Sequence, residues 1–139
     1  MLDKIDHIGI AVHSIDEKMS LYRDVLGMEF LGTDVVEEQG VKVAFFQVGE
    51  SKVELLEPLN ETGPVAKFLS KNGEGIHHIA FGCEDIDAAR GAVEQGGVRL
   101  LSDRPLDGAH GKLISFMHPK DTGRVLMELT MRRPDSDEH

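Results

Sequence analysis

Two stretches of the chain match when one is laid over the other: IDHIGIAVHSIDEKMSLYRDVLGMEFL at 5–31 and IHHIAFGCEDIDAARGAVEQGGVRLL at 76–101. The aligned pairs are Ile5 with Ile76, His7 with His78, Asp16 with Asp87, Gly27 with Gly97 and, further along, Glu54 with Glu128. Self-similarity at a nearly fixed spacing is the mark of a repeated structural unit. The chain is therefore predicted to contain two copies of one unit.

Each copy has the pattern of a strand, a helix and three more strands. Ser14 followed by Glu17 has the form of a capping box, and Asp85 can cap the second helix. Gly27 and Gly97 are natural left-handed stops for the two helices. Period-2 alternation of apolar residues supports the strands. The predicted strands lie at 5–12, 28–36, 41–48, 51–57, 76–83, 98–102, 111–117 and 123–130, and the helices at 15–26 and 86–96.

The predicted fold class is α+β, with two tandem βαβββ modules merged into one compact domain. The first module occupies 1–62 and the second 76–131. Between them, 63–75 holds a linker helix that begins at Pro64, where the first helical turn tolerates proline. Residues 132–139 form a polar, flexible tail. A chain of 139 residues is long enough for one such domain.

Composition narrows the class of protein. The net charge of −10 argues against nucleic acid or an anionic membrane as the main partner. The apolar runs are too short to span a bilayer, and the first residues lack the pattern of a signal peptide. The single cysteine, Cys83, excludes an internal disulfide and suits a reducing cytoplasm. We expect a cytoplasmic protein, and the charge does not exclude an anionic small molecule as its ligand.

Two His/Glu pairs at matching strand positions are the candidate metal ligands. Strand alternation places His7 on a face with two small residues, and His78 likewise, which leaves space for a ligand. Glu54 and Glu128 lie in apolar strands, where a carboxylate is costly unless it is paired or bound to a cation. Two histidines and two carboxylates suit one divalent ion per chain: cobalt, zinc, nickel, manganese or iron. The alternative reading is ordinary strand histidines with solvated glutamates. His77 points the other way and is not predicted to be a ligand.

Other polar residues suggest contacts to a substrate. His110 lies in the loop 108–111, and we expect it at most to contact the substrate. Lys112 and Lys120, with His118 and Arg104, can form a cationic rim for a phosphorylated substrate, against the alternative of ordinary solvation. Cys83 is interpreted as a small core residue, because no base is evident beside it.

The motifs VELLEPL at 53–59, VAKFLSKNGEGIHHIAF at 65–81 and GAHGKLISFMHPKDTGRVLMEL at 108–129 resemble the vicinal oxygen chelate superfamily. Within it, the chain is similar to the methylmalonyl-CoA epimerase family, and HPKDTG stands where glyoxalase I typically has a DPDGY-like sequence. The resemblance runs from about Leu2 to Met131. It implies a cupped mixed β-sheet around a metal site, with the helices outside, and often a homodimer.

The resemblance also implies roles for individual residues. His7, Glu54, His78 and Glu128 are the metal ligands, and the substrate is an acyl-CoA. Glu128 is expected to act as one base, with Glu54 or a water as its partner; the position where some relatives carry a second carboxylate aligns with Val43. Three alternatives remain: a glyoxalase I-like lyase, a ring-cleaving dioxygenase, and a metal-free protein that sequesters a drug.

Overall fold

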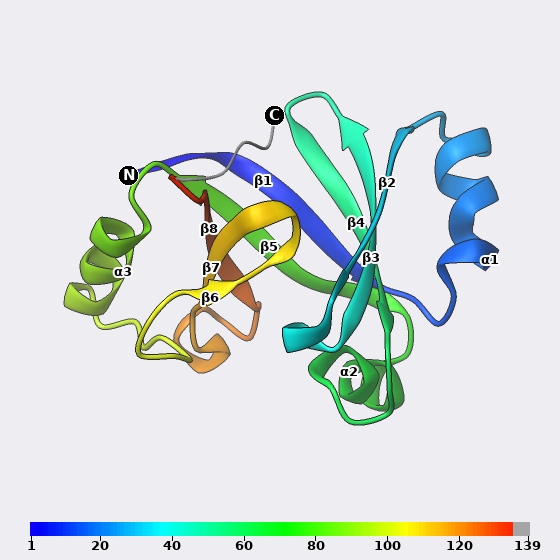
Figure 1. The fold of residues 1–139 in the computed structure, drawn as a ribbon. Helices are drawn as coiled ribbons and strands as arrows, with labels where there is room; N and C mark the ends of the chain where they lie inside the picture. Colours follow the sequence, from blue (N-terminus) through cyan, green and yellow to red (C-terminus); the bar gives the residue numbers. More distant parts are fainter. Residues whose placement is uncertain (135–139) are drawn as a thin grey trace. The chain divides into compact units, whose positions relative to one another are not determined.

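The computed structural model describes residues 1–134 and has the predicted α+β fold class, with eight strands and three α-helices in this part of the chain (Figure 1). The strands are β1 (Leu2–Ala11), β2 (Glu29–Val36), β3 (Val41–Val48), β4 (Ser51–Pro58), β5 (Gly75–Cys83), β6 (Leu106–Asp107), β7 (Lys112–Phe116) and β8 (Met127–Arg132). The α-helices are α1 (Ile15–Met19), α2 (Pro64–Asn72) and α3 (Ile86–Gln95). The order βαβββ thus occurs twice, as the repeat predicts. None of these helices is long and apolar enough to cross a membrane.

The chain divides into two compact units that share β1. One unit is residues 7–77, here called the first unit. The other, the second unit, combines residues 1–6 with the chain from His78 onward. The N-terminal half of β1 therefore belongs with the second unit, and its C-terminal half with the first. The predicted tail begins at Arg132, which is the last residue of β8, and its residues 135–139 lie outside the described part of the chain.

In the first unit the hydrogen-bonded strand order is β2-β3-β4-β1. Strand β4 runs antiparallel to β3 and parallel to β1. The core lies between this sheet and α1, and Phe46 is at its centre, with ring contacts to Tyr22 and Phe30. Its fully buried members are Val12, Ile15, Ala44, Phe46 and Leu55.

The second unit repeats this arrangement with the order β1-β5-β8-β7-β6. Strand β8 is parallel to β5 and antiparallel to β7. Helix α3 covers one face of the sheet, and the buried residues there are Cys83, Ile86, Ala89, Met117 and Leu129. Cys83 is thus a core residue, and burial raises the pKa of its thiol, which keeps it protonated.

The predicted helix signals are confirmed. The Ser14 hydroxyl accepts a hydrogen bond from the Glu17 backbone N–H, and the Asp85 carboxylate accepts one from Ala88. Gly27 has a φ of 72° and Gly97 a φ of 92°, the left-handed conformation that stops a helix. The first helix differs in one respect, because its second half, Ser20–Val25, winds as a π-helix.

The strand predicted at 98–102 is wrong. Only Leu100 makes an isolated bridge there, to Met117, and the sixth strand is instead Leu106–Asp107, paired with β7. Two backbone hydrogen bonds form this bridge, from the Leu101 N–H to the Phe116 carbonyl and from the His118 N–H to the Arg99 carbonyl. Side chains bond to other backbone groups of the segment: Asp121 accepts from the Arg99 N–H, and the Ser102 carbonyl accepts from Arg90. β8 also begins later than predicted, because a turn with positive φ at residues 123 and 124 precedes it.

Candidate metal centre

In the first unit His7 and Glu54 form a buried pair. His7 comes from β1 and Glu54 from the adjacent parallel strand β4. The His7 Nδ1 atom lies 3.3 Å from Glu54 Oε2, and the two residues are 4% and 6% exposed. A histidine and a carboxylate are thus held together away from bulk water.

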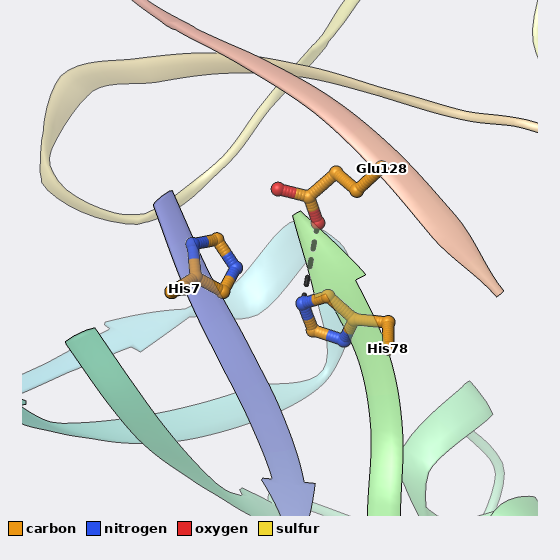
Figure 2. A group of neighbouring side chains, drawn as sticks. All are labelled: His7, His78 and Glu128. Atoms are coloured by element: carbon orange, nitrogen blue, oxygen red, sulfur yellow. Dashed lines mark ion pairs between the residues drawn. The ribbon is translucent and has the colours of Figure 1, made fainter. Parts of the chain in front are cut away.

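The second unit holds the equivalent pair. Figure 2 shows the ring of His78, on β5, facing the carboxylate of Glu128, on β8, with the ion pair drawn as a dashed line. The His78 Nε2 atom lies 3.4 Å from Glu128 Oε1, and the two residues are 6% and 3% exposed. The ring of Phe116 stands edge-on to His78, with 5.9 Å between ring centroids.

Strand register explains why the two pairs are alike. In each unit the glutamate lies opposite the residue two positions after the histidine: Gly9 pairs with Glu54, and Ala80 with Glu128. Those small residues leave room beside the carboxylate. On the other side, Phe45 pairs with Glu54, and Phe116 with Glu128. Each donor pair therefore has a small residue on one flank and an aromatic residue on the other.

The donor separations are compatible with metal ligands. A charge-assisted N–H···O bond is about 2.7–2.9 Å long, and both pairs exceed this range at 3.3 and 3.4 Å. Two atoms each about 2.1 Å from one ion lie about 3.0 Å apart at an octahedral angle and about 3.4 Å apart at a tetrahedral angle. The buried donors of the described chain therefore fit a divalent ion in both spacing and chemistry.

His77, the neighbour of His78, has a different environment. Its ring packs edge-on against Phe68 of α2, with 5.2 Å between centroids. Burial lowers the pKa of His77 to about 4, so the ring is neutral at pH 7. The contact with α2 agrees with the prediction that this histidine points away from the donors.

The three predicted substrate contacts lie in different surroundings in the second unit. Lys112, at the start of β7, donates to Asp6 of β1 across 2.8 Å, and both side chains are mostly buried. His110 has a positive φ of 55°, which is uncommon for a residue with a side chain. Lys120 is exposed in a short 3-10 turn, Pro119–Asp121.

Two carboxylates beside the predicted positions were missed from the sequence. Asp6 is buried by its ion pair with Lys112, although 106 residues separate the two. Val43, the position aligned with a second carboxylate in some relatives, is an inert buried residue, but Asp34 lies directly across from it on β2. Asp6 had a signal, a charge within an apolar strand. Asp34 could be found only from the pairing of β2 with β3.

Comparison with known proteins places the chain in a family. Residues 6–116 match the model of the Glyoxalase/Bleomycin resistance protein/Dioxygenase superfamily. The chain belongs to this superfamily. The resemblance predicted from the motifs is thereby confirmed, and the βαβββ repeat with its His/Glu pairs is the form the fold takes in this member.

Individual members of the superfamily are similar over nearly the whole chain. The ethylmalonyl-CoA/methylmalonyl-CoA epimerase of Cereibacter sphaeroides is 43% identical, over 93% of this chain and 98% of its own. A Streptomyces coelicolor methylmalonyl-CoA epimerase variant, solved with 2-nitronate-propionyl-CoA, is 46% identical with a TM-score of 0.92, covering 96% and 97%. A methylmalonyl-CoA epimerase solved with methylmalonyl-CoA and NH4+ is 45% identical with a TM-score of 0.92, covering 98% and 99%.

Proposed function

We propose that this protein is a methylmalonyl-CoA epimerase, an isomerase that interconverts the (2R) and (2S) forms of its substrate. The reaction removes the proton at C2, between a thioester and a carboxylate, and returns one to the opposite face through an enolate. Support comes from the full-length similarity to proteins of that name, one of them solved with methylmalonyl-CoA. The observation that carries the proposal is the pair of buried His/Glu donor sets in equivalent register.

His7, Glu54, His78 and Glu128 are proposed to bind one divalent ion per chain. The proposed ion is cobalt, and zinc, nickel and manganese are the alternatives. The ion, when bound, supplies positive charge that stabilises the negative charge on the substrate oxygens. His7 and His78 contribute neutral donors, and the two carboxylates balance the charge of the ion, so the buried set is electrically neutral.

Glu128 is proposed as one base. The residue is 3% exposed and pairs with Phe116 on the next strand, so it is shielded from bulk water. Return of a proton to the other face needs a second group, for which Glu54 is proposed. An inversion requires the two groups to act on opposite faces of the planar enolate.

His110, Lys112 and Lys120 are proposed to contact the CoA part of the substrate. Two of them are ammonium groups suited to phosphate, and the third lies on the loop that leads into β7. Lys112 would have to share its charge with Asp6. Replacing Lys120 with Met should raise KM for the CoA ester several-fold with little change in kcat, because it removes an exposed ammonium group without changing any of the four candidate ligands.

The chain is further proposed to work as a homodimer in the cytoplasm. The family resemblance favours a dimer, and the single, buried Cys83 suits a reducing compartment. Light scattering coupled to gel filtration tests the first point: a mass of one chain at working concentration would contradict it.

The decisive experiment measures deuterium incorporation at C2 of methylmalonyl-CoA in heavy water. Protein is stripped of metal, assayed, reloaded with cobalt and assayed again. Exchange and epimerisation that return only with the metal would support both the reaction and the donor set. Tight metal binding without exchange would refute the epimerase and direct attention to glyoxalase-type substrates. Ligand binding without metal would instead favour a sequestering protein.

A further inference from the structure

Thr130 in β8 has a buried hydroxyl whose role the donor set does not explain. The residue is 2% exposed, and within the described chain its Oγ1 atom has no hydrogen-bond partner. A hydroxyl offers one donor and two acceptor positions, and a buried one is nearly always satisfied by protein or by ordered water. Its isolation therefore points to a ligand.

The Thr130 side chain lies on the same face of the sheet as Glu128. Residues two apart on a strand share a face, and the residues on either side of Thr130, Leu129 and Met131, pack in the core under α3. The hydroxyl is thus turned away from that core, toward the face that carries Glu128, here called the ligand face. At the equivalent position of the first unit stands Leu56, so this polar group breaks the symmetry of the repeat.

The strand beside Thr130 provides a polar partner. Thr130 pairs with Gly82 of β5 in parallel register. A Cβ atom on Gly82 would lie only 2.6 Å from Oδ1 of Asp3, so this carboxylate occupies the space over the glycine on the ligand face. Neighbouring strands are about 4.8 Å apart. The Asp3 carboxylate and the Thr130 side chain therefore stand over adjacent strands on the same face, a separation on the order of one bridging water molecule.

Asp3 also connects this place to solvent. It lines a surface pocket of about 250 Å³ with five other residues of the second unit: Met1, Leu2, Glu84, Asp85 and Ala88. Water therefore reaches one side of the Asp3 carboxylate, while the other side lies over Gly82, next to Thr130. Glu128 is buried two residues along β8. A buried base that exchanges its proton with solvent needs such a connection.

We propose that Thr130 and Asp3 hold an ordered water molecule on the ligand face, and that this water connects Glu128 to solvent. The inference rests on the proposed function for the role of Glu128, but the water site itself does not. In the reaction, the Glu128 carboxylate takes the C2 proton. The resulting acid exchanges that proton for one from the water, which exchanges in turn with solvent at Asp3. One proton replaces another, and no other bond changes. Thr130 is thus a positioning residue.

The test compares Thr130→Val, which removes the hydroxyl at nearly constant shape, with Thr130→Ser, which keeps it. Thr33→Val, an exposed threonine of β2, is the matched control. In Thr130→Val, deuterium incorporated per epimerisation event should fall about tenfold in the direction in which Glu128 returns the proton, less than the loss typical of removing an acid or base itself. KM should stay unchanged, and Thr130→Ser and Thr33→Val should behave like the wild type. Asp3→Asn should also lower the incorporation of deuterium, as Thr130→Val does.

High-resolution crystal structures of the wild type and both Thr130 variants supply a readout that does not depend on activity. Density for a water within hydrogen-bond distance of Oγ1 should be present in wild type and Thr130→Ser and absent in Thr130→Val. No such water in the wild type would overturn the inference, even if the protein is an epimerase. The inference would also be overturned if the wild type shows this water but Thr130→Val incorporates as much deuterium as the wild type. If the wild type shows no epimerase activity, the proposed function fails, and the crystal structures still decide whether the water site exists.

Discussion

Glu128 combines a carboxylate with nearly complete burial, since the residue is 3% exposed. His78, at 3.4 Å, is too distant for a strong hydrogen bond, and Phe116 and Ala80 are apolar. Replacing Glu128 with Gln keeps the size but removes the base. We expect the variant to fold and to lose C2 exchange by at least about a hundredfold, the scale of general-base catalysis. Glu94→Gln, on the exposed side of α3, is the control, and an unchanged exchange rate in Glu128→Gln would exclude it as the base.

At the scale of the element, replacing either of two glycines with alanine should change the free energy of unfolding, and the two changes should have opposite signs. Gly27 ends the first helix with a φ of 72°, and a side chain there is strained even though the space is open. Gly91 lies within α3 on its exposed side, with nothing within 4 Å of an added Cβ. Gly27→Ala should lower the free energy of unfolding by about 1 kcal/mol. Gly91→Ala should raise it by about 0.5–1 kcal/mol. Urea unfolding of metal-free protein measures both, and equal shifts would contradict this account of the helix ends.

At the scale of the whole molecule, the central question is whether the two donor pairs hold one ion or two. With one shared ion, His7→Ala and His78→Ala should each lose all of the bound metal, because either change removes a ligand from the same ion. Elemental analysis after gel filtration measures this, with His13→Ala, an exposed histidine, as control. Retention of one ion in both variants would mean that each unit binds its own.

Metal should also stabilise the folded chain, because each histidine meets its glutamate on a neighbouring strand only after folding. A ligand at about 100 times its dissociation constant adds about 2.7 kcal/mol to the free energy of unfolding. Thermal unfolding with cobalt and with a chelator should therefore differ by several degrees in wild type. His78→Ala should show no such difference.

The sequence by itself determined the repeat and the fold class, and it predicted the four candidate donors. These follow from local rules: residues alternate along a strand, so the position of His7 relative to Gly9 and Ala11 can be read without the fold. Helix ends were also predictable, because Ser14 and Asp85 cap through hydrogen bonds that span only three residues.

Only the tertiary structure decided features that depend on partners distant in sequence. Leu106–Asp107 replaced 98–102 as the sixth strand, because 98–102 makes a single isolated bridge while Leu106–Asp107 pairs with β7 at two positions. The ion pair of Lys112 with Asp6 and the position of Asp3 over Gly82 join residues on strands whose adjacency the local pattern does not encode. The buried hydroxyl of Thr130 is likewise a feature that only the tertiary structure decided. Whether a buried polar group is satisfied depends on every strand and helix around it, and folding alone brings those neighbours together.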